Sequence, residues 1–128
     1  MKDQPLHSDI TEDIIKAFYQ VYNTLGHGFL EKVYENALVI VLRKMGHDVV
    51  QQHPISVYFE KEVVGEYFAD LVIDKLVIVE LKSVKSIDAS HQAQLLNYLK
   101  ATTFEIGPLL NFGEKPEFKR KAFQNSNK

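Results

Sequence analysis

Cysteine is absent from the 128-residue chain, which can therefore form neither a disulfide nor a thiolate metal site. A large excess of charge is also lacking: the formal net charge is −2, which gives no support for nucleic-acid binding. No apolar run reaches the roughly 20 residues of a membrane-spanning helix, and residues 1–5 lack the apolar stretch of a signal peptide. We therefore expect a cytoplasmic protein with no membrane partner.

Hydrophobic residues, at 45%, and charged residues, at 25%, are present in the proportions of an ordinary soluble domain. A chain of this length can bury a substantial core without disulfides, and it suits one domain. We expect a single domain over residues 1–128, with its core over about residues 9–121. The basic and polar tail from Lys119 to Lys128 is expected to be frayed.

Two helices are predicted in the first third of the chain. Asp9 and Glu12 have the spacing of a capping box, and apolar residues recur at helical spacing over residues 14–25. A second helical pattern covers residues 30–45, and Gly46 stands where a C-terminal glycine cap belongs. The middle of this second pattern is apolar nearly all round, which predicts a central, well-buried helix.

The pattern becomes strand-like from residue 48 onward. The expected elements are strands over 49–59, 63–73 and 76–81, a helix capped by Asp88 and ending near Ala101, a strand over 105–112 and a short strand near Phe118. Short turns between the first three strands predict a meander, and the helix then crosses over to add another strand. The sequence therefore predicts an α/β fold with a mixed sheet and helices packed on it.

Asp70, Glu80 and Lys82 lie on two of these predicted strands, which should be hairpin neighbours. Glu80 and Lys82 are two residues apart and share a face. Charges that end a buried apolar strand are costly unless they are paired or bind a metal. One interpretation is a salt bridge at the rim of the sheet. The other is a phosphodiesterase site, in which carboxylates hold Mg²⁺ or Mn²⁺ and the lysine orients water and stabilises charge.

The hairpin between these strands sets a geometric condition on the second interpretation. A two-residue turn over residues 74–75 would pair Asp70 with Val79 and place Glu80 on the opposite face. Both acids can bind one ion only if the loop has an odd length or the hairpin contains a β-bulge. We predict such an irregularity over residues 73–76.

Three motifs in one order carry a resemblance to a known family. Asp70 after Ala69, followed by Glu80-Leu81-Lys82, resembles the PD-(D/E)xK nuclease signature. Residues Gly28 to Tyr34, which read GFLEKVY, match the motif that names the GxxExxY protein family, a small branch of that superfamily. Gln94 to Tyr98 resembles the QxxxY motif of RecB-like nucleases. Ala69 departs from the proline of the superfamily name, but that proline is not a catalytic group.

The resemblance implies a restriction-endonuclease-like αβββαβ core, here with an extra N-terminal helix. It also implies that Asp70, Glu80 and the backbone carbonyl of Leu81 hold Mg²⁺ or Mn²⁺. Lys82 would orient the attacking water. Glu31 matches the helical acid that often completes such a site, directly or through water.

The remaining candidates have simpler interpretations beside the functional ones. Glu31 and Tyr34 share a helix face, but first-turn acids are common and a tyrosine there suits a core with its hydroxyl bonded. Gln94 and Tyr98 also share a face. Gln94 could hold a ligand carboxylate or the nucleic-acid backbone, and Tyr98 could stack or contact phosphate. Equally, Gln94 could cap a strand carbonyl and Tyr98 could only pack.

The leading hypothesis is a metal-dependent nuclease that hydrolyses phosphodiester bonds of DNA or RNA, with DNA favoured. The alternative is a non-catalytic module that binds nucleic acid or protein, since a fold does not establish an activity. A phosphoesterase acting on a small substrate is a third possibility. The small size suggests that specificity comes from a partner chain or a homodimer, and the apolar residues 39–41 are a conceivable interface.

Overall fold

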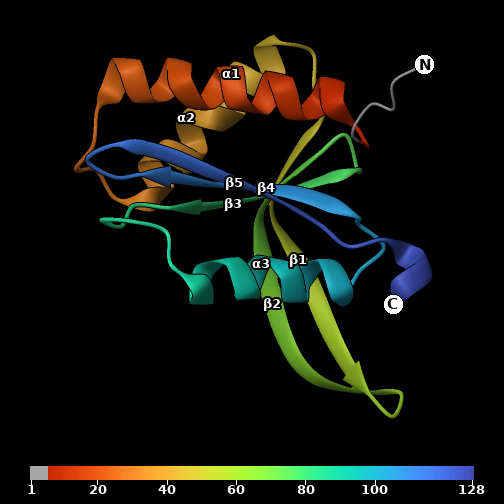
Figure 1. The fold of residues 1–128 in the computed structure, drawn as a ribbon. Coiled ribbons are helices and arrows are strands. Elements are labelled where there is room, and N and C mark those ends of the chain that lie inside the picture. The colour runs from red at the N-terminus through yellow and green to blue at the C-terminus, as the bar shows by residue number, and fades with distance from the viewer. Residues whose placement is uncertain (1–5) are drawn as a thin grey trace, which may run out of the picture.

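The computed structural model describes residues 6–128, and five strands form one mixed sheet within it (Figure 1). The elements are α1 (Ser8–Leu25), α2 (Glu31–Lys44), β1 (Val49–Phe59), β2 (Glu62–Ile73), β3 (Val77–Lys82), α3 (Ala89–Lys100), β4 (Ile106–Phe112), β5 (Pro116–Ala122) and a 3₁₀ turn (Asn125–Asn127). This confirms the predicted α/β fold and its element order. Residues 1–5, which the single-domain prediction included, lie outside the described part.

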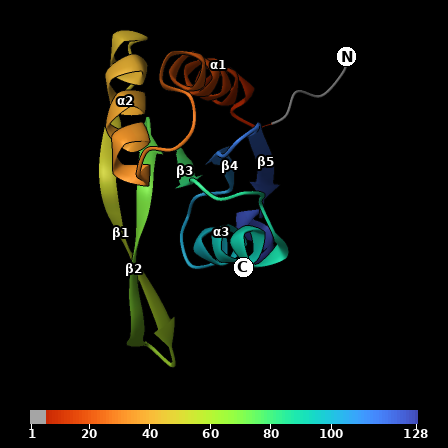
Figure 2. The ribbon, with the colours of Figure 1, turned by 90° about the vertical axis from the view of Figure 1, so that its left-hand side faces the viewer.

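The strands lie side by side in the order of the chain, from β1 to β5. The pairs β1–β2, β2–β3 and β4–β5 are antiparallel, whereas β3 and β4 are parallel. Helix α3 makes the crossover that a parallel pair requires. Figures 1 and 2 show α1 and α2 on one face of the sheet and α3 on the other. The chain therefore forms three layers.

Each face of the sheet has its own hydrophobic core. The larger core lies under α1 and α2, and the ring of Phe112 is stacked on Tyr34 with centroids 4.2 Å apart. Phe18 meets the same ring edge-on at 4.8 Å. The smaller core lies under α3, where Leu95 and Leu99 are fully buried. Aromatic rings bury the most area per residue, so the first core supplies most of the packing.

The start of α1 differs from the prediction. The helix begins at Ser8, its N-cap is His7, and no side chain caps it, so the capping box of Asp9 and Glu12 does not form. His7 has a left-handed backbone with φ of 54°, and its carbonyl accepts a hydrogen bond from the Thr11 hydroxyl. The chain therefore turns into the helix two residues before Asp9, the position that the motif indicated.

Helix α2 is also less buried than predicted. It lies on one face of the sheet rather than at the centre, and Ile40 is 57% exposed while its neighbour Val39 is buried. A helix with apolar residues on every side is not central here, because the sheet covers only one of its sides. None of the helices within residues 6–128 has the length and apolar character needed to cross a membrane.

The basic C-terminal segment is ordered, contrary to the predicted fraying. Lys119 to Lys121 belong to β5, which pairs with β4 along its whole length. The side chain of Lys128 donates to the carbonyls of Thr102 and Phe104, both at 2.7 Å. Antiparallel pairing satisfies the backbone here, which a charge pattern alone does not reveal.

The β1–β2 hairpin is much longer than the rest of the sheet. Figures 1 and 2 show its outer part projecting beyond the sheet as an arm. We call residues 55–67 with their turn the hairpin arm. Its tip turns through Glu60 and Lys61, both with positive φ. Pro54 lies in β1, an edge strand, which is a position that tolerates a residue without an N–H donor.

Candidate active site

The β2–β3 hairpin meets the geometric condition set by the sequence. Residues 74–76 form a three-residue loop, since Ile73 pairs with Val77. The same register places Asp70 opposite Glu80. Directly opposite residues of an antiparallel pair project from the same face. The predicted odd-length loop is thus confirmed, and the two acids are neighbours.

Strand β2 also changes its facing at Asp70. Leu71 packs in the core under α1 and α2, whereas Ala69 packs in the core under α3. Strict alternation would put both on one face, so the strand twists between them. Gln52 lies across from this point on β1 and has a left-handed backbone, with φ of 53°. The irregularity lets Asp70 reach groups on both sides of the sheet.

The two acids replace part of the backbone ladder between β2 and β3. Glu80 Oε2 accepts a hydrogen bond from the backbone N–H of Asp70 at 2.7 Å. In return, Asp70 Oδ2 accepts one from the N–H of Leu81 at 2.8 Å. Hydrogen bonds to a charged acceptor are short and strong, so both carboxylates are held in fixed positions. The role of the Leu81 carbonyl as a metal ligand stays a prediction.

Burial makes this pair expensive to ionise. Glu80 is 4% exposed, and burial, reinforced by the negative charge of Asp70, raises its pKa to about 8. Burial likewise raises the pKa of Asp70, against the opposing effect of the Leu81 N–H. Every buried side-chain nitrogen and oxygen within residues 6–128 has a hydrogen-bond partner. What the site lacks is therefore positive charge, not hydrogen bonds.

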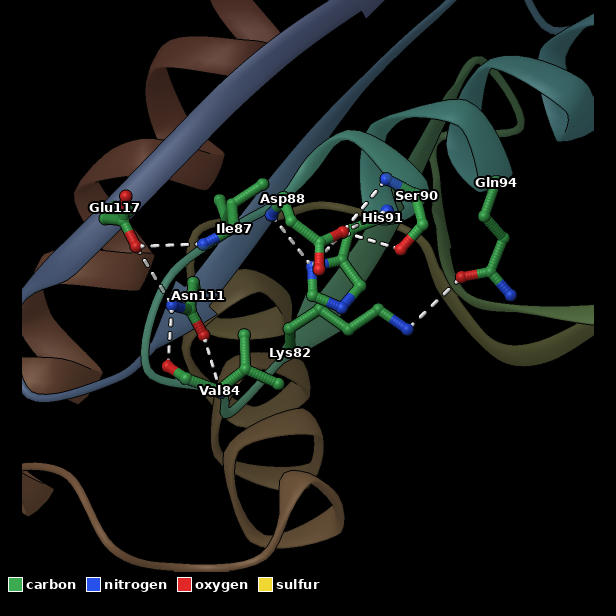
Figure 3. Close-up of polar contacts among 9 residues, drawn as sticks. All are labelled: Lys82, Val84, Ile87, Asp88, Ser90, His91, Gln94, Asn111 and Glu117. Atoms are coloured by element: carbon green, nitrogen blue, oxygen red, sulfur yellow. Dashed lines mark hydrogen bonds and ion pairs between the residues drawn. The ribbon is translucent and has the colours of Figure 1, made fainter.

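Lys82 brings one positive charge to the acids. It follows Glu80 on the same face of β3, and its charge opposes the raised pKa values of Asp70 and Glu80. Its ammonium donates to Gln94 Oε1 at 3.2 Å, and Gln94 Nε2 donates to the Tyr98 hydroxyl at 3.1 Å. Figure 3 shows Lys82 extended from β3 toward Gln94 on α3. The structure thus joins three predicted site residues in one chain of hydrogen bonds.

The loop between β3 and α3 is fixed by a buried asparagine. Asn111, on β4, accepts from the N–H of Val84 and donates to its carbonyl, both at 2.9 Å (Figure 3). Glu117 accepts from Asn111 and from the N–H of Ile87, each at 3.2 Å. A Cβ at Gly113 would lie 2.4 Å from the Val84 carbonyl, so only glycine fits there. The loop that follows Lys82 is therefore held tightly.

Helix α3 begins with a complete capping box, as the sequence predicted for Asp88. Its side chain accepts from the N–H groups of Ser90 and His91, and His91 Nδ1 accepts from the N–H of Asp88 (Figure 3). These bonds satisfy N–H groups that the first turn of a helix leaves free. The cap fixes the start of the helix that carries Gln94.

Glu31 approaches the site but does not join the acid pair. It is the first residue of α2 and is exposed. Although the residue is exposed, protein surrounds part of its carboxylate, and this partial burial raises its pKa. The charges of Lys82 and Asp70 also act on it, which places all three in one neighbourhood. Within residues 6–128 it forms no hydrogen bond with Asp70 or Glu80. Its role as a metal ligand stays a prediction.

Tyr34 lies in the core rather than at the site. It is fully buried, and its hydroxyl donates to the Gly26 carbonyl at 2.6 Å. The hydroxyl also accepts from the N–H of Phe29 at 3.2 Å. Tyr34 therefore fixes the turn into α2, which is the simpler of its two interpretations.

Two polar residues near the site were missed by the sequence reasoning. Glu35 is 3% exposed, and its carboxylate accepts from Gln52 at 2.9 Å, from Gln51 at 2.7 Å and from Lys32 at 2.9 Å. Gln52 also donates to Asp70 Oδ1 at 3.3 Å. Glu35 stands four residues after Glu31, a helical spacing that could have drawn attention to it. Gln52 offered no signal, because its role depends on its left-handed backbone.

The donor set fits a hard divalent cation bound by two carboxylates. No group of three or more acids, histidines or cysteines in residues 6–128 is already arranged around a common point. Mg²⁺ does not require such a group, because it commonly binds one or two carboxylates and completes its shell with water and substrate phosphate. The raised pKa of Glu80 marks the position where a dication would relieve the buried charge. Asp70, Glu80 and the Leu81 carbonyl are the residues that would hold it.

Three comparisons with known proteins bear on this site. The crystal structure of SSO0001 has a similar fold, with a TM-score of 0.57 over 91% of this chain, at 19% identity. The present chain spans 59% of that structure's length. A search of curated proteins found no match. A family model described as the PD-(D/E)XK nuclease superfamily matches residues 8–121, which include the acid pair and the lysine. The chain therefore belongs to the PD-(D/E)XK nuclease superfamily.

Proposed function

We propose that this protein is a metal-dependent nuclease that hydrolyses phosphodiester bonds of DNA or RNA, with DNA favoured. The observation that carries the proposal is the buried pair Asp70 and Glu80, locked to each other's strands with Lys82 alongside. In a structural salt bridge, each acid would be paired with its own cation. Here the charge of a single lysine, Lys82, acts on both acids. The segment Gly28 to Tyr34 further supports assignment to the GxxExxY branch.

The chain's own groups have distinct parts in this reaction. Asp70 and Glu80 bind the cation, together with the Leu81 carbonyl and, from α2, Glu31. Bound Mg²⁺ or Mn²⁺ supplies a Lewis acid for the phosphate and lowers the pKa of a water molecule. Lys82 orients the attacking water and neutralises charge that develops on the phosphate oxygens. Gln94, through its contact with Lys82, holds that ammonium in place.

One observation favours the non-catalytic alternative: within residues 6–128, no three acids surround a common point. A binding module on this fold would bind nucleic acid without needing a metal. The acid pair argues against a binding module that needs no metal. Burying a carboxylate costs free energy, and a neutral residue at position 80 would remove that cost if no cation had to be bound. Metal binding therefore separates the two functions.

The test is a cleavage assay on single- and double-stranded DNA and RNA with Mg²⁺ or Mn²⁺. The variants Lys82→Ala and Asp70→Asn should lose roughly 100-fold or more in rate. Lys115→Ala, which removes a charge from an exposed turn, is the matched control and should cleave like the parent. Cleavage that survives in both site variants would reveal a contaminant. Calorimetry that detects no Mn²⁺ binding to the parent would overturn the proposal in favour of the binding module.

A further inference from the structure

A hollow lies next to the acid pair, between the hairpin arm and α3. Its volume is about 840 Å³, within the usual range for a ligand pocket. The arm contributes Tyr58 and Tyr67, and α3 contributes Gln94, Asn97, Tyr98 and Lys100. We call this hollow the tyrosine pocket. Its lining residues come from the arm and from α3, and Figures 1 and 2 show the arm leaving the sheet on the side where α3 lies.

The tyrosine pocket is continuous with the candidate active site. Gln94 lines the pocket and also accepts the hydrogen bond from Lys82. Tyr98 lines it as well, and burial raises the pKa of its hydroxyl, with the nearby charge of Glu80 adding to the shift. A phosphodiester placed at Lys82 would therefore extend its neighbouring nucleotide toward the pocket.

The lining has the chemistry of a nucleobase site. Tyr67 is 48% exposed, and its ring centroid lies 5.7 Å from that of Tyr98. Gly65 leaves space for the Tyr67 ring along the strand, since an added Cβ would lie 3.2 Å from Cε2. Asn97 and Gln94 supply amides that can donate to and accept from base edges. Rings provide stacking area and amides provide directional contacts.

The charge of the lining suits a phosphate-bearing ligand. No Asp or Glu is among the residues of the described chain that line the tyrosine pocket, although the chain as a whole has more acids than bases. Lys100 is a lining cation, and its ammonium lies 5.4 Å from the ring centroid of Phe123. Lys100 therefore already has an aromatic partner, and the features of this lining that suit the ligand are its tyrosine rings and, among the described residues, its lack of carboxylates.

We propose that the tyrosine pocket binds an unpaired nucleobase, stacked on Tyr67, so that the substrate is a single-stranded segment of nucleic acid. A base within a duplex has both faces covered by its neighbours and cannot present one to a tyrosine ring. An unpaired base can do so, and stacking tolerates every base because each has a π-face. This inference rests on the proposed nuclease function and names the substrate class of that site.

The test measures binding apart from cleavage. A short fluorescein-labelled thymidine oligonucleotide and a duplex of matched length are titrated with the full chain in chelator, and fluorescence anisotropy is followed. The single strand should bind more tightly than the duplex. Tyr67→Ala should weaken single-strand binding by roughly five-fold or more, while Tyr67→Phe keeps the ring and should bind like the parent. Melting temperatures of all variants show whether each is folded.

Phe68→Ala is the matched control for the loss of an exposed ring. Phe68 is the next residue on β2 and is 55% exposed, but it does not line the tyrosine pocket. Its removal should leave binding within about two-fold of the parent, since a ring outside the pocket has no base to stack on. An oligonucleotide of the same length with abasic sites is a second control. It should bind more weakly, and Tyr67→Ala should then cause no further loss.

The outcomes separate this inference from the proposed function. Tighter duplex binding, or equal losses from Tyr67→Ala and Phe68→Ala, would overturn the inference even if the protein cleaves DNA. An unchanged loss on the abasic strand would overturn it too. Single-strand binding that depends on Tyr67, without cleavage in Mg²⁺ or Mn²⁺, would support the inference and remove the nuclease function.

Discussion

The two faces of the sheet differ in the side chains that they bury. Under α1 and α2, aromatic rings pack face to face and edge to face around Phe112. Under α3, the sheet carries the buried groups Glu80 and Asn111, and a hydrogen-bond chain runs from Lys82 to the helix. The first face buries mainly aromatic and aliphatic rings and chains, with Glu35 as its buried acid, whereas the second carries the buried acid and amide next to the candidate site, which cost free energy to bury. Stability should therefore come mainly from the α1 and α2 side of the sheet, and chemistry from the α3 side.

Breaking the aromatic core should have the largest effect on folding. Phe112 is buried between Tyr34 and Phe18, so Phe112→Ala removes a ring and leaves a cavity. The free energy of unfolding should fall by about 3–5 kcal/mol, measured by urea denaturation. Phe118→Ala on β5 removes the same ring at a 40% exposed position and should cost less than about 1 kcal/mol. Phe118 lies on the same face of the sheet, beside Tyr19 of α1, so equal losses would show that the buried ring contributes no more than an exposed one.

Removing the buried charge of Glu80, on the α3 face, should raise the free energy of unfolding rather than lower it. The folded-state pKa of Glu80, about 8, lies above its ordinary value of 4.5, so the folded protein binds the proton more tightly than the unfolded chain does. Stability therefore falls as pH rises from about 4.5 to 8. Glu80→Gln can still accept from the Asp70 N–H, and it should raise the free energy of unfolding on the order of a few kcal/mol at pH 8.

Denaturation at several pH values without metal measures this difference. It should shrink as pH falls toward 4.5 and disappear below that value, where the parent carboxyl becomes protonated in both states. Saturating Mg²⁺ should stabilise the parent and not the variant. A Glu80→Gln variant that is less stable than the parent at pH 8 would show that the pair holds the fold together, which would end the contrast between the faces.

The connection between the two faces can be tested at Gln52. Its amide joins Glu35 under α2 to Asp70 at the site. Gln52→Ala should weaken Mn²⁺ binding by roughly ten-fold in calorimetry, because residues that orient a ligand carboxylate have effects of this size. Gln51→Ala is the matched control, since Gln51 also bonds Glu35 but does not contact Asp70. Equal effects from both variants would assign the loss to Glu35 rather than to the position of Asp70.

The smallest expected effect lies at His47, on the α1 side. Its ring nitrogens contact Asp74 at 2.6 Å and Asp13 at 2.7 Å, so a protonated ring serves both carboxylates. Burial opposes the charge, but the hydrogen bonds to Asp74 and Asp13 outweigh it and raise the pKa of His47 above 6.5. The contribution to stability is full below pH 6.5 and is lost as pH rises through the folded-state pKa.

His47→Gln should therefore lower the free energy of unfolding by about 1 kcal/mol below pH 6.5, and by less at alkaline pH. Urea denaturation of parent and variant at acidic and alkaline pH measures this. His53→Gln, which changes a histidine that contacts no carboxylate in the described chain, is the matched control. A loss that does not depend on pH would mean that His47 acts by packing rather than by charge.

Local patterns predicted the helices and strands and their order. Apolar periodicity depends on neighbours in the chain, which is why the helix and strand order was predicted correctly. The odd-length loop of the β2–β3 hairpin followed from requiring Asp70 and Glu80 to share a face. The capping box at Asp9 failed because the chain enters α1 at His7, two residues earlier, through a left-handed backbone. The backbone conformation at His7 depends on where the rest of the chain lies, which the local sequence does not encode.

By itself, the sequence placed Asp70, Glu80 and Lys82 on two neighbouring strands and put Glu80 and Lys82 on one face, because side chains alternate along a strand. Only the tertiary structure decided which groups hold these charged side chains in position. Strand β2 changes its facing at Asp70, Gln52 reaches the acid from β1, and Gln94 reaches the lysine from α3. These contacts join residues far apart in the chain, and their existence depends on the sheet's twist and on helix packing, which no local pattern encodes.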